Sequence, residues 1–133
     1  MEKMLLKRVD IPNAADIDVA LKHGAYSTLK TAFDMRPVDV VNEVKRANLR
    51  GRGGAGFPTG LKWGTVAKSP GAKKYVICNA DESEPGTFKD RELIEKDPHQ
   101  LIEGIIIGSY AIGAHISFIY IRAEFGFGAK RLE

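Results

Sequence analysis

The segment KKYVICN, residues 73–79, is apolar, contains the β-prone run Tyr-Val-Ile and is bounded by turn-forming residues. Such a run predicts a buried strand of a parallel sheet. A second strand is predicted over ISFIYIR, residues 116–122. Between them, residues 98–114 predict a helix, whose apolar run is interrupted by Glu103 and is too short to cross a bilayer. Strand, helix and strand in this order predict an α/β fold with a parallel sheet.

The chain before this unit predicts short helices. Residues 15–35 predict two helical pieces broken at Gly24, and a third helix is expected to begin at Pro37. Another short helix is expected over residues 59–68, with Thr59 as its N-terminal cap.

These elements predict two parts, an N-terminal helical segment over residues 1–49 and the first part of an α/β domain over residues 50–133. The second part is expected to contain a glycine-rich loop, a strand, an acidic loop, a helix and a strand, at residues 51–60, 73–79, 79–97, 98–114 and 116–122. The chain stops where one more helix begins, so we expect the domain to be truncated.

Composition and charge narrow the class of protein. The apolar fraction of 44% and the charged fraction of 28% are those of an ordinary globular chain. The single cysteine, Cys78, excludes a disulfide framework and any iron–sulfur or zinc site made from several cysteines of this chain. No Asp or Glu occurs between Glu43 and Asp81, a basic stretch that an acidic one follows. This order suits a ligand with phosphates at one end, although two solvated faces would give it as well.

The segment GRGGAG, residues 51–56, matches the pattern G-x-G-x-x-G. A predicted helix precedes it, whereas the usual dinucleotide fingerprint follows a strand. Successive glycines can turn their backbone N–H groups into a concave anion site, to which Arg52 and Lys62 would add positive charge. A loop that needs glycine only for its own turns remains the alternative.

Polar side chains gather directly after the first predicted strand, in NADESEPGTFKDR, residues 79–91. Ligands of open α/β sheets bind at the carboxyl ends of strands. Asn79 offers an amide, and Asp81, Glu82 and Glu84 offer carboxylates that can accept hydrogen bonds from hydroxyl or ring N–H groups. An Asx turn with a helix-capping loop is the alternative interpretation of these residues. The spacing does not match a calcium loop.

Together, LRGRGGAGFPTGLKWG (49–64) and YVICNADESEPGTFKDRELIEKDPHQLIEG (75–104) closely resemble the flavoprotein subunit of respiratory complex I. The resemblance implies a Rossmann-like domain that holds FMN and oxidises NADH. Hydride would pass from NADH to FMN, and single electrons then to iron–sulfur clusters and quinone. NAD-linked hydrogenase and formate dehydrogenase subunits share the glycine loop and are the alternative family members.

The resemblance also implies a set of cofactor-binding residues. FMN contacts are implied for Gly51, Arg52, Gly53, Lys62, Asn79, Asp81 and Glu82. NADH contacts are implied for Gly54, Phe57 and Glu84, and Ala55, Gly56 and Gly60 complete the loop. No residue of this chain is expected to act as an acid, base or nucleophile or to bind a metal, because the redox chemistry belongs to the cofactors.

The same resemblance implies a setting for the protein. It would be a peripheral subunit on the cytoplasmic side of the bacterial inner membrane, with no direct membrane insertion. Its partners would be a small thioredoxin-like [2Fe–2S] subunit and other peripheral-arm subunits. A [4Fe–4S] cluster is expected only in a C-terminal part outside this chain, and the present chain alone is expected to be inactive. A non-catalytic module that binds the anionic backbone of RNA or DNA through the basic residues 45–74 is the alternative from another class. The complex I resemblance itself implies no nucleic-acid partner.

Overall fold

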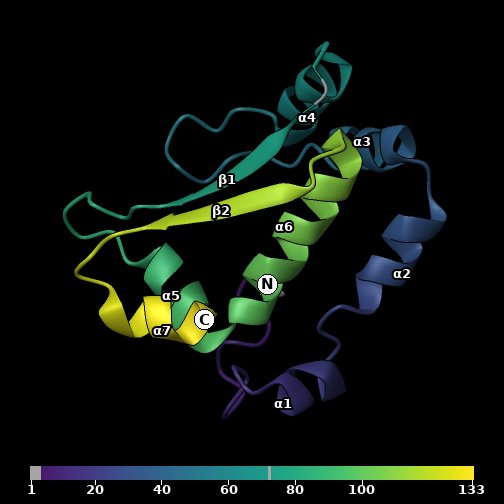
Figure 1. Cartoon of the computed structure of the whole chain (residues 1–133). Coiled ribbons are helices and arrows are strands. Elements are labelled where there is room, and N and C mark those ends of the chain that lie inside the picture. The colour runs from purple at the N-terminus through teal and green to yellow at the C-terminus, as the bar shows by residue number, and fades with distance from the viewer. Residues whose placement is uncertain (1–3, 72) are drawn as a thin grey trace. The chain divides into compact units, whose positions relative to one another are not determined.

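The computed structural model describes residues 4–71 and 73–133, which form helices and two neighbouring strands (Figure 1). In chain order they are α1 (Ile17–Lys22), α2 (Ser27–Asp34), α3 (Pro37–Arg46), α4 (Thr59–Lys68), β1 (Tyr75–Ala80), α5 (Lys89–Lys96), α6 (Pro98–Ile112), β2 (Ile116–Ile121) and α7 (Gly126–Leu132). No helix in the described ranges is long and apolar enough to span a membrane.

The N-terminal helices begin and end at residues whose chemistry explains the boundary. Asp16 caps α1, because its carboxylate accepts hydrogen bonds from the amides of Asp18 and Val19. Gly24, with φ of +84°, separates α1 from α2 as expected. Pro37 occupies the first turn of α3, where its missing N–H is not needed.

The cap expected for α4 is wrong. Thr59 is the first helical residue, and Pro58 holds the N-cap position without a side-chain hydrogen bond. Pro58 cannot cap with its side chain, but the amide of Thr59 is still paired, since it donates to the carbonyl of Leu49 over 2.8 Å.

The strand–helix–strand unit confirms the predicted fold class. β1 and β2 are hydrogen-bonded neighbours in a two-stranded sheet, and α6 lies between them in the chain. Both strands run in the same direction (Figure 1), as a helical crossover requires.

The expectation that the first strand is buried is only half right. Side chains alternate between the two faces of a strand, and one face of each strand is exposed. Ile77 in β1 and Tyr120 in β2 are 68% and 62% exposed, whereas Ala80 is buried. Apolar runs in the sequence therefore do not mean burial on both faces here.

The acidic segment 79–97 is not irregular throughout, which corrects the sequence-based expectation. Its second half forms α5, with Ile94 almost fully buried. Two ion pairs at i, i+4 spacing, Arg91–Glu95 and Glu92–Lys96, support the helix on its surface.

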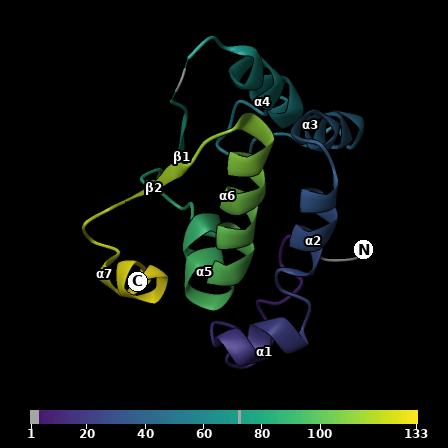
Figure 2. The ribbon, with the colours of Figure 1, turned by 45° about the vertical axis from the view of Figure 1, so that its right-hand side comes forward.

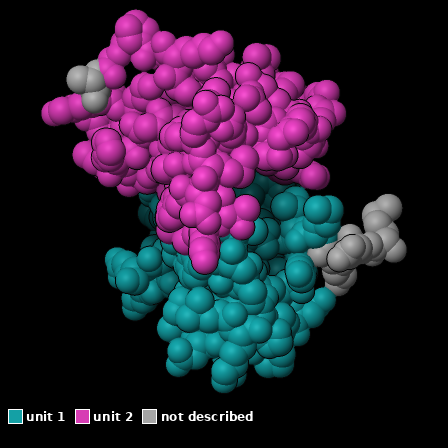
Figure 3. All heavy atoms as spheres, turned by 90° about the vertical axis from the view of Figure 1, so that its right-hand side faces the viewer, with its two compact units in different colours: residues 1–28, 77–104, 119–133 teal, residues 29–76, 105–118 magenta. Residues whose placement is uncertain are grey.

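The chain divides into two compact units, which Figure 3 colours separately. Unit 1 comprises residues 1–28, 77–104 and 119–133, and unit 2 comprises residues 29–76 and 105–118. Strands β1 and β2 and helices α2 and α6 each contribute residues to both units.

Unit 1 contains a small apolar core and a buried ion pair. Ile94 of α5 and Ile121 of β2 lie beside Gly128 of α7, where a β-carbon would come within 3.1 and 3.4 Å of them. The guanidinium of Arg8 binds the carboxylate of Asp97 with three contacts of 3.0–3.1 Å. This pair ties the N-terminal segment to the junction of α5 and α6.

Unit 2 has its own core, in which α3 and α4 lie side by side (Figures 1 and 2). The buried side chains are Ala32, Val40, Val41 and Ala111, with Met35, Trp63, Ile107 and Tyr110 packed against them. Gly108 allows α6 to approach Trp63 of α4 closely, since a β-carbon there would lie 3.0 Å from the Trp63 ring.

Candidate nucleotide-binding segments

The glycine-rich loop lies in unit 2 and is closed at its base. An isolated antiparallel bridge joins Arg50 and Pro58, and the amide of Gly51 donates to the carbonyl of Phe57 over 2.9 Å. The guanidinium of Arg50 also donates to the carbonyl of Gly56 over 3.1 Å. These bonds hold residues 51–57 as one compact loop that leads directly into α4.

The amides at the tip of this loop have no acceptor within the described part of the chain. None of the backbone N–H groups of residues 52–56 takes part in a hydrogen bond there. Gly54 and Gly56 have φ of +109° and +61°, so the direction of the backbone changes between successive N–H groups. Consecutive amides in such a conformation form a site for an anion. The exposed side chains of Arg52 and Lys62 add positive charge near the loop in sequence.

The structure separates glycines that the protein itself requires from one that it does not. At Gly60 a β-carbon would lie 2.6 Å from the backbone nitrogen of Lys45, so this glycine is needed where α4 meets α3. Gly54 and Gly56 are needed for their positive φ. Gly53 has no such φ, and a β-carbon there would meet no atom within 4 Å. Nothing in the described chain accounts for glycine at position 53.

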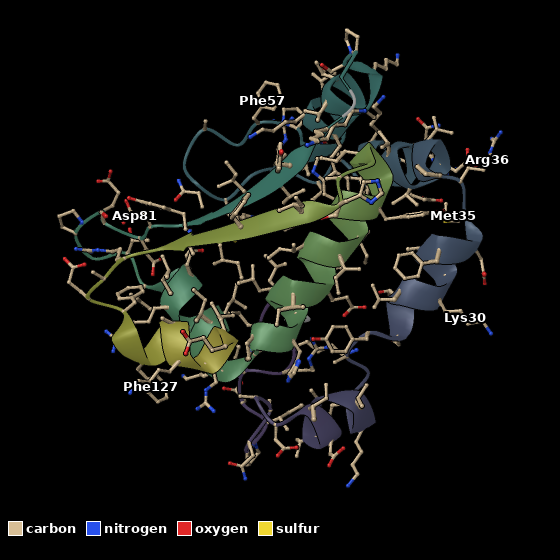
Figure 4. The ribbon with its side chains drawn as sticks, viewed as in Figure 1. Lys30, Met35, Arg36, Phe57, Asp81 and Phe127 are labelled. Carbon is tan, nitrogen blue, oxygen red and sulfur yellow. The ribbon has the colours of Figure 1, made fainter. Side chains whose placement is uncertain are left out.

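The aromatic residues near the loop differ in their surroundings. Phe57, labelled in Figure 4, is 53% exposed and is free to stack on a planar ligand. Trp63 instead packs in the core of unit 2. The residues that follow it, Gly64 and Thr65, provide no second exposed aromatic side chain.

The acidic segment lies in unit 1, after β1, and part of it serves the fold. The side chain of Asn79 accepts from the amide of Asp81 over 3.1 Å, which is an Asx turn. The buried carboxylate of Glu82 accepts from the amides of Asp90 and Arg91 over 2.9 and 3.1 Å and so caps α5. The turn-and-cap interpretation is therefore correct for Asn79 and Glu82.

Two carboxylates of this segment remain exposed. Asp81, labelled in Figure 4, accepts from the hydroxyl of Ser83 over 2.6 Å and faces solvent. Glu84 is exposed as well, and its backbone carbonyl closes a turn with the amide of Thr87 over 3.1 Å. These two side chains, rather than that of Glu82, have oxygens available to a ligand.

Sequence reasoning missed one residue at this segment, Arg122, the residue after β2. Its guanidinium donates to the backbone carbonyl of Glu82 over 3.0 Å and lies 3.8 Å from the carboxylate of Asp81. The position at the end of the second parallel strand, opposite the end of the first, is the signal that could have found it.

The single cysteine shows no sign of a nucleophile. Cys78 is half-buried in β1, and burial, with the nearby carboxylate of Asp90, raises the pKa of its thiol. Within the described residues no group of three His, Cys, Asp or Glu side chains is arranged to hold a metal ion.

This pKa predicts slow alkylation of the native protein. At pH 8.5 the thiol of Cys78 should react with iodoacetamide several-fold more slowly in the folded chain than in the same chain unfolded in urea, because the thiolate is the reactive form. The rate is followed by mass spectrometry. Equal rates in the two states would show that the fold neither shields the thiol of Cys78 from the reagent nor raises its pKa.

A scan against protein families matches residues 44–133 to the Nuo51 FMN-binding domain. The chain belongs to this family. Among curated proteins it is 58% identical over 125 residues to the F subunit of NADH-quinone oxidoreductase in Aquifex aeolicus, covering 94% of this chain and 29% of that protein. It is 48% identical over 122 residues to NADP-reducing hydrogenase subunit HndC of Solidesulfovibrio fructosivorans, covering 92% of this chain and 24% of that protein.

Among solved structures, the chain resembles one from an NAD+-reducing [NiFe]-hydrogenase in the air-oxidized state. The TM-score is 0.76 and the sequence identity 38%, over 98% of this chain and 21% of the other. The chain thus spans about a quarter to a third of the length of the curated relatives that it matches.

The residues present fit the chemistry of the flavin mononucleotide for which this family is described. A phosphate needs N–H donors and positive charge, which the open amides of residues 52–56 supply. Ribityl hydroxyls and ring N–H groups need acceptors, which the exposed carboxylates of Asp81 and Glu84 supply. Each segment, considered by itself, therefore presents the donors or acceptors that one portion of the flavin requires.

Proposed function

We propose that this chain forms part of the FMN- and NADH-binding flavoprotein subunit of an NADH-quinone oxidoreductase. The observation that carries the proposal is the glycine loop, whose tip amides have no acceptor in the described chain and whose Gly53 no internal contact explains. Membership of the Nuo51 FMN-binding family supports the same assignment.

Different residues would bind different parts of FMN and NADH, according to their chemistry. The amides of residues 52–56, with Arg52 and Lys62, would bind phosphate. Gly51, whose amide donates to the carbonyl of Phe57, would close the base of the loop against FMN. Asn79 and Asp81 would bind the polar groups of FMN, with Glu82 holding their segment in place. Phe57 would stack on the adenine of NADH, and Glu84 would accept from its hydroxyl groups.

FMN, when bound, would supply the redox chemistry by taking a hydride from NADH and releasing single electrons to iron–sulfur clusters. The task of this chain is then to bind and orient the two ligands and to exclude water from them. None of its side chains needs to act as a general acid or base.

The assembly and location are proposed from the names of the relatives. The NADH-quinone oxidoreductase and hydrogenase relatives are each named as subunits of larger complexes. We infer a peripheral position on the cytoplasmic side of the inner membrane, beside a thioredoxin-like [2Fe–2S] subunit, with a [4Fe–4S] cluster in sequence outside this chain. The higher identity to the Aquifex aeolicus protein, 58% against 48% for the hydrogenase subunit, favours the quinone-linked complex.

A chimera tests the proposed function directly. This chain replaces the matching residues of the Aquifex aeolicus relative, and the chimera is compared with the unaltered Aquifex protein. We expect about one FMN per chimera, seen as flavin absorbance after gel filtration, and reduction of ferricyanide at the expense of NADH. The 133-residue chain alone should bind FMN weakly and oxidise no NADH, because it matches only 29% of the length of the Aquifex aeolicus relative.

The unaltered Aquifex protein is the positive control for the chimera. An Aquifex protein that oxidises NADH beside a chimera that neither retains flavin nor oxidises NADH would overturn the assignment. Salt-sensitive binding of RNA or DNA by such a flavin-free chain would instead support the anion-binding module.

A further inference from the structure

Arg122 contacts Asp81 and Glu82, near the start of the acidic segment. The residue follows β2 directly, and residues 81–84 follow the neighbouring parallel strand β1. Its side chain is 30% exposed and makes contacts in several directions. One guanidinium nitrogen donates to the carbonyl of Glu82 over 3.0 Å, and another donates to the carboxylate of Glu124 over 3.1 Å. The guanidinium also lies over the ring of Phe125, 5.9 Å from its centroid.

Glu82 is consequently held from both its backbone and its side chain. Its carbonyl accepts from Arg122, and its carboxylate, 1% exposed, accepts from the amides of Asp90 and Arg91 at the start of α5. Because Asp81 is bonded to Glu82, the backbone from which the exposed carboxylate of Asp81 projects has little freedom to move. Glu82, and with it Asp81, is therefore clamped between the end of β2 and the first turn of α5.

We propose that Arg122 is a positioning residue that, by holding the backbone of Glu82, keeps the neighbouring carboxylate of Asp81 in the orientation required to bind the flavin. The inference rests on the proposed function, since it assigns a purpose to the clamp that the fold alone would not require. The distance of 3.8 Å between Arg122 and the carboxylate of Asp81 leaves that carboxylate able to accept from a ligand.

The chemistry of arginine matters for this role. Its planar guanidinium directs donors at fixed angles, so one side chain can bind the Glu82 carbonyl and the Glu124 carboxylate while stacking on Phe125. A lysine at this position has a single ammonium group and can replace one of these contacts at a time. Arg122→Lys should consequently weaken FMN binding less than Arg122→Gln does.

The matched control is Arg91→Gln. Arg91 also lies over the Phe125 ring, 5.7 Å from its centroid, and its side chain pairs with Glu95. That side chain is not bonded to the carbonyl of Glu82. The control therefore removes the same charge and a similar ring contact in the same unit without releasing the acidic segment.

The first measurement uses the 133-residue chain without any ligand. The carboxylate of Glu82 accepts hydrogen bonds from the backbone amides of Asp90 and Arg91. We expect hydrogen exchange at these two amides to become at least about tenfold faster in Arg122→Gln. Arg122→Lys should show a smaller increase, and Arg91→Gln should leave the Asp90 amide unchanged. Unchanged exchange in Arg122→Gln would overturn the clamp.

The second measurement uses the chimera described above. The Kd for FMN should rise at least about tenfold in Arg122→Gln and less in Arg122→Lys, and the visible circular dichroism of the bound flavin should change. The Tm without FMN should match that of Arg91→Gln. A Kd for Arg122→Gln equal to that of Arg91→Gln would show that Arg122 is merely structural.

The two hypotheses fail differently. A wild-type chimera that binds no FMN would contradict the proposed function, while hydrogen exchange would still report on the clamp. A wild-type chimera that binds FMN beside an Arg122→Gln variant that binds it equally well would overturn only the role of Arg122.

Discussion

Asp97→Ala is expected to lower the free energy of unfolding by about 3–5 kcal/mol, the usual cost of removing one partner of a buried ion pair. The side chain of Asp97 is fully buried, and that of Arg8 is 8% exposed. Removing the carboxylate leaves the guanidinium buried without its acceptor. It also removes the hydrogen bond of 3.3 Å by which Asp97 accepts from the amide of Gln100 in the first turn of α6.

Two further variants separate these contributions in urea unfolding of the 133-residue chain. Asp97→Asn keeps an oxygen for the Gln100 amide but lacks the charge, so its loss should be smaller than that of Asp97→Ala. Glu43→Ala breaks the exposed pair with Arg46 and should cost under about 1 kcal/mol. If Asp97→Ala cost no more than Glu43→Ala, the buried pair would contribute nothing to holding unit 1 together.

The parts of the fold that could be predicted are those that local chemistry determines. Pro37 is favoured in a first turn by its own ring, and Gly24 takes a positive φ that other residues avoid. The strand–helix–strand unit followed from apolar runs of the right lengths. Each of these signals lies within a few residues of the structure that it produces.

What could not be predicted depends on residues that are far apart. The pair Arg8–Asp97 joins positions 89 residues apart, and no local pattern marks either residue as a partner. Helix α5 was missed because its first amides are capped by Glu82, eight and nine residues earlier, instead of by an adjacent Ser or Thr.

The candidate site shows the same division. Residue types alone identified both segments, since amides, carboxylates and glycines follow each other in a recognisable order. Which carboxylates are available depended on the backbone, because Glu82 faces α5 whereas Asp81 and Glu84 face solvent. The clamp formed by Arg122 required the two strand ends to be placed side by side.

Gly53→Ala is expected to lower the affinity for FMN without lowering stability, whereas Gly60→Ala is expected to lower stability. This contrast distinguishes a ligand-binding loop from a merely structural one. At Gly60 the new methyl group would lie 2.6 Å from the backbone nitrogen of Lys45 and 2.8 Å from its α-carbon. Backbone cannot move aside cheaply, so α3 and α4 must separate. We expect a loss of about 1–3 kcal/mol in the free energy of unfolding of the 133-residue chain.

At Gly53 the methyl group meets nothing within 4 Å, and the residue has no positive φ. The stability of Gly53→Ala should therefore be unchanged, or raised by about 0.4–1 kcal/mol because alanine restricts the unfolded chain. Gly54→Ala is less informative, since φ of +109° strains any side chain there whether or not a ligand binds.

FMN affinity in the chimera decides between the two interpretations of the loop. If a ligand approaches the backbone at Gly53, the methyl group occupies space that the ligand needs, and the Kd should rise about 10- to 100-fold, equivalent to about 1–3 kcal/mol. That loss would occur at full stability, so it could not be attributed to unfolding. A Gly53→Ala chimera with unchanged Tm and unchanged Kd for both FMN and NADH would mean that the G-x-G-x-x-G pattern is a turn with no ligand against it.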